Sequence, residues 1–421
     1  MNARSEAGAR ITVVTSGHLS TCPRMLKATD TLNAAGYRVR VVATCHEPWA
    51  ADADRDVRAR RALPVSVVDY RRGHGSTYWR SGLRHQLARR SAAAVGPARA
   101  PWAIVTHAFG RVHAELVEAA IEAPADFIYG GTTGALAASS CAARRLGVPY
   151  GIDFEDFHSG ETSGVDAPFV DALAARIERQ VASGAAFVTT SSAAIASAYQ
   201  DAYAISPVVI HNTFALPKRP PEFRRSDPLR LRLYWFSQTV GPGRGLELAV
   251  DAIGQAEIAA DLTVRGRPLP GYLESLSSLA AARAPRLRIA HEAPAPPDAM
   301  VDLASGHDIG LALEEMAPRN RQLCLPNKPL TYLLAGLAVA LTDTPGQHPL
   351  GTDLGTAAAL VAPGDVDALA SALAAWSRDA AVLERAKRCA WAAAVRRWHW
   401  EHPLESGRLC ALVRDALQPR S

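Results

Sequence analysis

Short apolar runs rich in β-branched residues alternate with longer Ala- and Leu-rich segments along the whole chain. Strands that are buried on both faces give such continuous runs, and the segments between them have the length of crossover helices. In the first half the alternation predicts strands at residues 11–15, 38–43, 126–129, 150–154, 187–190 and 208–210. We expect helices at residues 23–35, 133–146 and 168–184. Residues 52–82 show no clear period, apart from what looks like an exposed basic loop near residues 71–75.

The second half repeats this alternation after a Pro- and Arg-rich segment at residues 217–228, which predicts a stiff linker. Its predicted strands are residues 231–236, 261–264, 287–290, 309–313, 338–342 and 359–361. Its predicted helices are residues 245–253, 270–282, 297–304, 327–335 and 366–376, followed by a helical tail at 380–417. The fold class is therefore α/β, and 421 residues suit two doubly wound domains.

Composition narrows the class of protein. Hydrophobic residues make up 48% of the chain and charged residues 21%, which fits a soluble globular protein. No apolar run approaches the roughly 20 residues of a membrane helix, and residues 1–10 lack the apolar core of a secretion signal. Six scattered cysteines without a CxxC pair argue against a zinc site or a disulfide framework, so we expect a cytoplasmic protein without a metal.

The net charge of +5 indicates the kind of partner. A basic balance fits anionic nucleotides, and it also fits peripheral contact with the inner face of a membrane. We expect no nucleic-acid partner, because the chain has no zinc finger, no aromatic RNA-binding pattern and no basic zipper.

The first candidate site is a Gly-Pro-Gly-Arg-Gly run at residues 241–245, between a predicted strand and a predicted helix. Glycine lets the backbone approach a ligand closely, and the helix N-terminus offers unpaired N–H groups to an anion. Arg244 adds a charge that can bind phosphate oxygens in a bidentate way. An ordinary turn with a surface arginine is the alternative.

The second candidate site is the start of the predicted helix at residues 327–335. Asn327 is a suitable N-cap, and Lys328 then lies beside the positive end of the helix dipole. Arg319 and Arg321 lie a few residues upstream, so several cations gather near one helix start. An anion site and a solvated basic loop both explain this pattern.

The third candidate is the acidic segment 153–161, which follows a predicted strand. In open α/β folds the carboxyl ends of strands face the ligand. Glu155 or Asp156 can hydrogen-bond a sugar hydroxyl or act as a base, with His158 nearby. Acidic caps on a loop are the alternative.

The order and spacing of these motifs resemble the GT-B glycosyltransferases of family 4, a retaining group. The clearest stretch is residues 327–346, with Asn327-Lys328, Tyr332-Leu333, Ala335-Gly336, Asp343 and Pro345-Gly346. Further likenesses are the turn at His211-Asn212 and the segment 398–401. The resemblance implies two Rossmann-like domains that face each other across a cleft. It implies an acceptor-binding domain at 1–216, a linker at 217–230, a donor domain at 231–397 and a C-terminal helix at 398–421 that crosses back.

The resemblance also implies roles for individual residues. Catalytic roles would fall to Glu155, Asp156 and His158. Donor contacts would come from Gly17, Gln238, Gly243, Arg244, Arg265, His291, Glu314, Glu315, Arg319, Asn327, Lys328 and Thr331. The chain departs from the family where a pair of glutamates, eight positions apart, is replaced by Leu323 and Thr331. The second of those glutamates holds the ribose in relatives, and Thr331 offers a hydroxyl there but no carboxylate. Glu314 or Glu315, just after the strand at 309–313, would take the role of the first glutamate from a longer loop. The family's arginine position is also changed, to Gln238.

The expected activity is transfer of a sugar from a nucleoside diphosphate sugar, such as a UDP- or GDP-sugar, to a hydroxyl group, with retention. The acceptor would be a carbohydrate, a lipid-linked molecule or a small molecule, in glycan, glycolipid or natural-product biosynthesis. A catalytically silent homologue that binds nucleotide sugar or acts as a scaffold is the main alternative, because of Thr331. An NAD-dependent dehydrogenase is disfavoured, since no GxGxxG motif follows the first strand.

Overall fold

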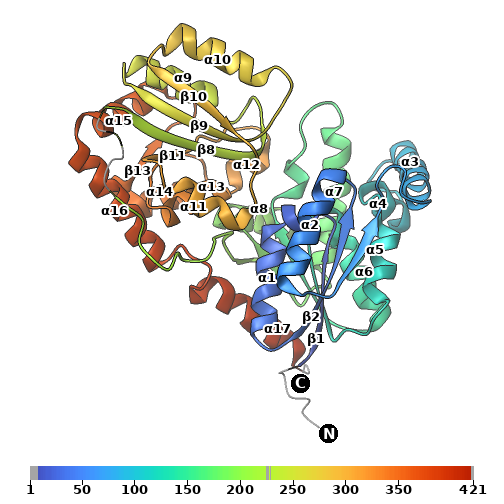
Figure 1. Ribbon diagram of the computed structural model, residues 1–421. Coiled ribbons are helices and arrows are strands. Elements are labelled where there is room, and N and C mark those ends of the chain that lie inside the picture. Colours follow the sequence, from blue (N-terminus) through green and yellow to red (C-terminus); the bar gives the residue numbers. More distant parts are fainter. Residues whose placement is uncertain (1–7, 224–226, 228, 419–421) are drawn as a thin grey trace. The chain divides into compact units, whose positions relative to one another are not determined.

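The computed structural model describes residues 8–223, 227 and 229–418. The chain divides into two compact units (Figure 1). Unit 1 consists of Met1–His211 and Ser406–Ser421, and unit 2 of Asn212–Glu405. The segment predicted as a linker, 217–230, includes residues 224–226 and 228, which lie outside the described residues, as do residues 419–421 of the predicted last helix.

Unit 1 contains a seven-stranded parallel sheet with the order β3-β2-β1-β4-β5-β6-β7. Its strands are β1 (Arg10–Thr15), β2 (Arg38–Cys45), β3 (Val65–Asp69), β4 (Phe127–Gly131), β5 (Tyr150–Glu155), β6 (Phe187–Thr190) and β7 (Val208–Val209). The chain order reverses between β1 and β4, which is where doubly wound sheets place their ligands. All of these strands except β3 lie where the sequence predicted strands.

Helices cover the sheet of unit 1 and include several within residues 48–121. They are α1 (Pro23–Ala34), α2 (Pro48–Arg61), α3 (Thr77–Val95), α4 (Trp102–Phe109), α5 (His113–Ile121), α6 (Leu136–Leu146), α7 (Ala167–Ala182), α8 (Ala193–Tyr203) and α17 (Arg408–Leu417). The last helix packs on α1, and Arg408 donates to the carbonyl of Val209 at 2.9 Å. No helix in the described part of the chain has both the length and the apolar character needed to cross a bilayer.

Unit 2 contains a six-stranded parallel sheet with the order β10-β9-β8-β11-β12-β13. Its strands are β8 (Leu231–Val240), β9 (Ala260–Pro268), β10 (Leu287–Glu292), β11 (Ile309–Ala312), β12 (Ala338–Thr342) and β13 (Ala358–Val361). β8 and β9 run past their predicted ends, with an irregular register between Phe236 and Thr239. The two units therefore have the same doubly wound topology, and the predicted fold class is confirmed.

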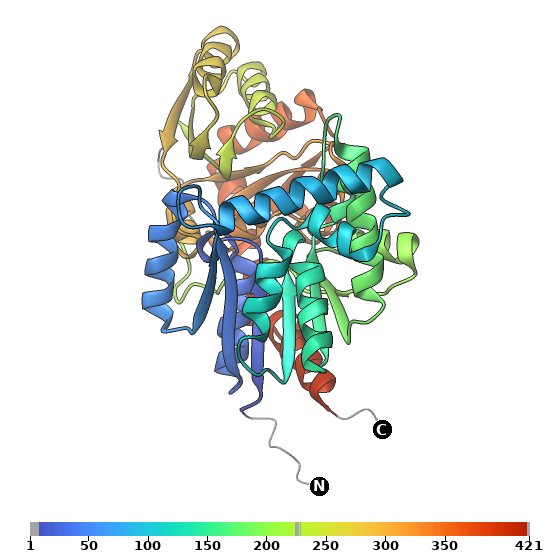
Figure 2. The ribbon, with the colours of Figure 1, turned by 90° about the vertical axis from the view of Figure 1, so that its right-hand side faces the viewer.

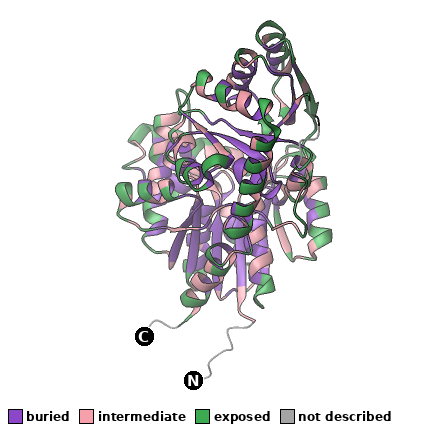
Figure 3. Ribbon diagram, turned by 90° about the vertical axis from the view of Figure 1, so that its left-hand side faces the viewer, coloured by how far each residue is buried: buried purple, intermediate pink, exposed green. Residues whose placement is uncertain are grey.

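The helices of unit 2 are α9 (Leu246–Gln255), α10 (Tyr272–Arg283), α11 (Met300–Ala304), α12 (Arg319–Leu323), α13 (Asn327–Leu334), α14 (His348–Leu354), α15 (Val366–Arg378) and α16 (Ala380–Arg396). The predicted single helical tail is wrong, because α16 ends at Arg396 and α17 begins only at Arg408. Figure 3 shows most of the strands in purple, as buried residues, and much of the helices' outward surface in green. Apolar layers on both faces of each sheet thus hold the strand ends that carry the candidate sites.

Candidate functional site

The glycine-rich loop after β8 is fitted closely to its neighbours. Gly243 and Gly245 have φ angles of 72° and 76°, which residues other than glycine rarely adopt. A Cβ atom at Gly245 would collide with the backbone carbonyl of Leu313. Gly245 is the N-cap of α9, so this helix begins two residues later than Arg244, and its first turn leaves N–H groups without intrahelical partners. The loop therefore presents a helix N-terminus that favours an anion.

Arginines border this loop. Arg244 is half-buried and directly precedes the N-cap. Arg321, on α12, donates to the carbonyl of Gly243 at 2.6 Å and so fixes the loop. Arg319, the other arginine of α12, is exposed. Arg321 of this helix thus contacts the glycine-rich loop.

A buried ion pair lies next to the loop. The ammonium Nζ of Lys328 is 2.6 Å from Oε1 of Glu314, and both side chains are almost fully buried. Burial by itself would raise the pKa of Glu314. The positive charge of Lys328, with smaller contributions from Arg244 and Arg321, outweighs burial and lowers that pKa below its usual value. Lys328 also lies over Trp235, with Nζ 5.4 Å from the ring centre.

Other residues that the sequence singled out in unit 2 have different surroundings from those expected. The N-cap of α13 is Pro326, and Asn327 is the first helical residue rather than the cap. Thr331 is fully buried, and its hydroxyl donates to the carbonyl of Asn327 at 3.0 Å, so this hydroxyl is already used within its own helix. Gln238 is exposed within β8 rather than in the loop, and Glu315 is exposed beyond β11.

Arg265 and His291 lie at the carboxyl ends of β9 and β10. Arg265 donates to the hydroxyl of Tyr234 at 2.9 Å and to the carbonyl of Ala293 at 2.7 Å. Nε2 of His291 is 2.8 Å from the carbonyl of Gly266. Both side chains therefore brace the ends of neighbouring strands, beside the glycine-rich loop that follows β8.

In unit 1 the loops after β1 and β4 are tied together by hydroxyl groups. The amide of Ser16 donates to Oγ1 of Thr132 at 2.8 Å, and the two hydroxyl oxygens are 2.9 Å apart. The amide of Gly134 donates to the Ser16 hydroxyl at 3.1 Å. Gly17 is packed so closely that a Cβ atom there would collide with the sulfur of Cys22. These contacts fix the loops at the point where the sheet order reverses.

The acidic segment after β5 is anchored by a buried ion pair. Asp153 accepts two hydrogen bonds from Arg24, at 2.5 and 2.9 Å, and Arg24 also donates to the carbonyl of Ile210. Glu155 follows with a φ of 46°, an unusual value for a non-glycine residue. Burial, and then the neighbouring charge of Asp156, raise the pKa of Glu155 to about 8. This carboxyl can therefore accept or donate a proton near neutral pH.

His158 lies at the end of the same segment, where it is buried and paired with Glu161. Its Nδ1 is 2.8 Å from Oε2 of Glu161 and 3.3 Å from the hydroxyl of Thr133. Burial by itself would lower the pKa of His158, but the charge and hydrogen bond of Glu161 outweigh it and raise the pKa to about 9. His158 is thus a cation at neutral pH.

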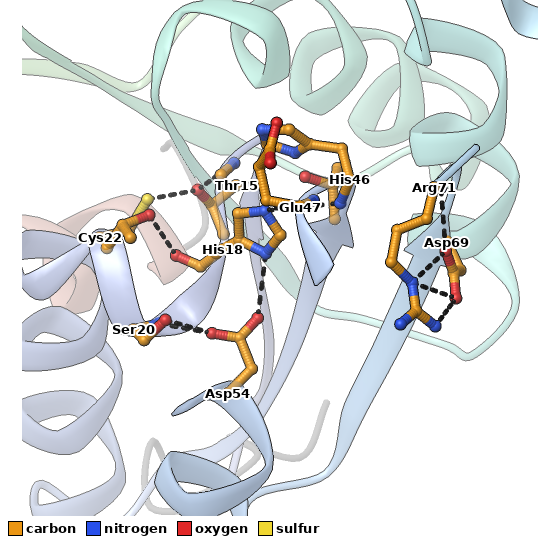
Figure 4. A network of polar contacts seen from close by, with 12 residues as sticks. Thr15, His18, Ser20, Cys22, His46, Glu47, Asp54, Asp69 and Arg71 are labelled. Atoms are coloured by element: carbon orange, nitrogen blue, oxygen red, sulfur yellow. Dashed lines mark hydrogen bonds and ion pairs between the residues drawn. The ribbon is translucent and has the colours of Figure 1, made fainter. Parts of the chain in front are cut away.

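The turn between β1 and α1 is held by His18 (Figure 4). Nε2 of His18 accepts a hydrogen bond from the amide of Glu47 at 3.1 Å, so the ring proton belongs on Nδ1, which faces Asp54 at 3.4 Å. Asp54 also accepts from the amide and the hydroxyl of Ser20. The ring of His46 lies 4.3 Å from that of His18. His18 thus connects its own turn with the loop after β2 and with helix α2.

Sequence reasoning missed several members of these sites. Glu161 lies three residues after His158 and was a visible signal. Arg321 was noted as a nearby cation but was not assigned a contact with the glycine-rich loop. The pairing of Arg24 with Asp153 spans 129 residues and left no local signal. Within the described ranges, no group of three or more His, Cys, Asp or Glu side chains is arranged to hold a metal ion.

Residues 23–213 match the family model described as "Glycosyl transferase 4-like domain", which corresponds to most of unit 1. No curated protein matches the sequence.

Solved structures resemble the chain over its whole length. HepE from Anabaena, solved with UDP-glucose, has a TM-score of 0.66 at 17% identity, over 97% of this chain and 99% of HepE. TarM from S. aureus has a TM-score of 0.67 at 7% identity, over 98% and 100% of the two chains. Sucrose-phosphate synthase from Thermosynechococcus elongatus has a TM-score of 0.65 at 12% identity, over 97% and 98%. At these identities the likeness establishes the fold, which is GT-B as predicted.

Proposed function

We propose that the chain is a glycosyltransferase that transfers a sugar from a nucleoside diphosphate sugar to a hydroxyl acceptor with retention. Its GT-B fold and the match of residues 23–213 to a glycosyl transferase 4-like domain support this proposal. The observation that carries the donor assignment is the glycine-rich loop of unit 2. It combines the N-terminus of α9, the half-buried Arg244 and the neighbouring pair of Lys328 with Glu314. These are the groups that bind a diphosphate.

In this reaction the bond between the anomeric carbon and the diphosphate oxygen breaks, and the acceptor oxygen forms the new bond. Negative charge develops on the leaving diphosphate. Arg244 and the N–H groups of α9 stabilise that charge from fixed positions, which lowers the barrier without reorganisation during the reaction. Lys328 stabilises the diphosphate only in part, because Glu314 already accepts one of its hydrogen bonds and offsets its charge.

The strand ends of unit 1 supply the acceptor side of the proposal. Glu155, with its raised pKa, would hydrogen-bond a sugar hydroxyl or take the proton that the acceptor loses. His158 remains a cation in the same segment and would donate a hydrogen bond to a sugar oxygen. Asp156 acts through Glu155 by raising its pKa.

A uridine nucleotide is the first donor to test. HepE was solved with UDP and with UDP-glucose, and TarM with UDP, α-GlcNAc-glycerol and the oligosaccharide fondaparinux. These neighbours support a UDP-sugar donor and a carbohydrate or lipid-linked acceptor for this chain. A thermal-shift screen with UDP-, GDP- and other nucleotide sugars tests the donor, because a ligand that binds only the folded state raises the unfolding temperature. A screen without any shift would contradict the proposal.

A catalytically silent nucleotide-sugar-binding protein is the second candidate function. The arrangement at Thr331 favours it, because no carboxylate stands at the family's ribose-binding position and the hydroxyl there bonds to Asn327. Donor hydrolysis without acceptor separates the two candidates. An active transferase releases sugar slowly from a UDP-sugar, and the variant Glu155→Gln loses that release. A silent protein shifts in the thermal screen and releases none.

A further inference from the structure

A buried carboxyl that the proposed reaction does not use lies beside the acidic segment 153–161. Glu178 is on α7 and is completely buried. Its two oxygens accept hydrogen bonds, both of 2.6 Å, from the hydroxyls of Tyr199 and Tyr203 on α8. α7 and α8 are the green and yellow-green helices of unit 1 in Figure 2. A buried charge is costly unless it is paired and hydrogen-bonded, so the groups around Glu178 indicate its role.

Glu178 and Tyr199 together hold the backbone of the acidic segment. The amide of Ser159 donates to Oε1 of Glu178 at 3.0 Å. The hydroxyl of Tyr199 lies 2.9 Å from the carbonyl oxygen of Asp156, and the amide of His158 donates to that hydroxyl at 3.4 Å. One carboxyl and the tyrosine bound to it therefore fix three backbone groups of this segment, and the place of the His158 ring depends on them.

Glu178 also acts on the charge of His158. Burial would lower the pKa of His158, but Glu161 outweighs burial, and Glu178 and Asp156 act in the same direction as Glu161. The donors to Glu178 are two hydroxyls and an amide, all uncharged, so they leave its negative charge to act on the imidazolium. Tyr199 stays neutral, because burial and then the charge of Glu178 raise its pKa well above the usual value.

The ring of His158 has one nitrogen left for a ligand. Nδ1 is bound to Glu161, whereas Nε2 is buried and has no hydrogen-bond partner among the described residues. In the proposed function Nε2–H is therefore the donor that meets a sugar oxygen. A charged donor binds such an oxygen more strongly than a neutral one, so both the position and the charge of this ring matter.

From these contacts we infer that Glu178 is a positioning residue, which fixes the acidic segment and holds His158 in place as a charged donor without touching the substrate. The role of His158 toward a sugar rests on the proposed function, but the action of Glu178 on His158 does not. Loss of the Glu178 charge should therefore weaken the bond to the sugar in two ways, through a displaced ring and through a smaller fraction of imidazolium.

NMR of protein labelled in its histidines tests the inference without donor or acceptor. The signal of His158 is the one that His158→Gln removes. We expect Glu178→Gln to lower the pKa of His158 by about one unit, because an opposite charge is lost from a buried site. Glu118→Gln is the matched control, since it removes an exposed carboxylate of α5, and it should leave this pKa unchanged. A pKa of His158 that Glu178→Gln does not alter would overturn the inference.

Hydrolysis of UDP-glucose without acceptor supplies the second readout. Glu178→Gln should lower kcat about ten-fold, the value of a weakened charge-assisted hydrogen bond, and change KM less than about two-fold, because the diphosphate binds in unit 2. A rise in KM with kcat unchanged would overturn the inference. If the unmodified protein releases no glucose, the proposed function loses its support, and the NMR measurement still decides the role of Glu178.

A milder variant covers the case in which Glu178→Gln does not fold, which circular dichroism shows. Tyr199→Phe removes the hydroxyl between Glu178 and the carbonyl of Asp156 but keeps the charge and the ring. We expect it to lower kcat about five-fold while the fold is kept, as the loss of one buried hydrogen bond should. An unchanged kcat in a folded Tyr199→Phe protein would contradict the positioning of the acidic segment by this pair.

Discussion

Removing either partner of the Lys328–Glu314 pair should destabilise the protein strongly. The two charged atoms are 2.6 Å apart, and the side chains are 7% and 3% exposed. At an effective dielectric constant of about 20, their attraction is about 6 kcal/mol, which offsets the cost of removing both charges from water. Lys328→Met leaves the carboxylate of Glu314 buried without a partner charge, and Glu314→Gln does the same to the ammonium of Lys328. Each variant should lose about 3–5 kcal/mol of stability.

The double variant is the sharper part of this prediction. Lys328→Met/Glu314→Gln removes both charges, so it should be less destabilised than the worse single variant, and the cycle should give a clear coupling energy. Urea-induced unfolding followed by circular dichroism measures all four proteins. The exposed pair of Arg388 with Glu384, on the surface of α16, is the control, and Arg388→Met should hardly change the urea midpoint.

Acid should remove the contribution of Glu314. Its pKa is lowered in the folded state, so its stabilising effect is present above its unfolded pKa of about 4.5 and is lost as the pH falls through the folded pKa. The stability gap between the unmodified protein and Glu314→Gln should therefore narrow in acid. Single variants that cost less than about 1 kcal/mol would refute the reasoning, because the pair would then behave as a solvated one.

Three further predictions concern both units. Burial raises the pKa of Glu155 to about 8, so the folded state binds one more proton than the unfolded state between about pH 4.5 and 8. The free energy of unfolding therefore falls as the pH rises through this range. Urea titrations at several pH values should show that Glu155→Gln removes this pH dependence. The charge and hydrogen bond of Glu161 outweigh burial and raise the pKa of His158 to about 9. The stabilisation by this pair is therefore full below about pH 6.5 and is lost as the pH rises through 9. Glu161→Gln should lower the pKa of His158, which NMR can measure. Gly245→Ala should lower the melting temperature and the nucleotide affinity, because the new Cβ atom would collide with Leu313. Gly271 has nearly the same φ but no atom near its Cβ position, so Gly271→Ala should cost only the backbone strain, about 1 kcal/mol. The first prediction would be contradicted if the stability of the unmodified protein did not change with pH, and the second if Glu161→Gln left the pKa of His158 unchanged. Equal loss of stability in Gly245→Ala and Gly271→Ala would contradict the third.

Strand positions could be predicted because parallel strands give continuous apolar runs, as β12 does with its five buried residues. The helices within residues 48–121 were mostly missed for a physical reason. The side chains that α3 buries fully are Ser81, Ala88 and Ala92, and such small residues give no apolar period. The end of β8 was misplaced because Ser237 to Thr239 are polar and lie where the register is irregular.

The candidate site was predictable where local chemistry defines it. The glycines around Arg244 and the cation at Lys328 stand in short segments with a clear backbone role. Their partners could not be derived, since only the fold brings Glu314 to Lys328, 14 residues away, or Arg24 to Asp153, 129 residues away. The environment of Thr331, buried within its own helix, likewise depends on tertiary packing that a single sequence does not reveal.

Nucleotide binding by the Arg244 variant tests the central claim most directly. Isothermal titration calorimetry with UDP should give measurable binding to the unmodified protein, and Arg244→Gln should weaken it about ten-fold or more, the value of a lost charge-assisted contact. Arg288→Gln, which removes the same charge from an exposed position of β10, should bind UDP like the unmodified protein. Equal affinities for the unmodified protein and Arg244→Gln would contradict the assignment of the diphosphate site to the glycine-rich loop.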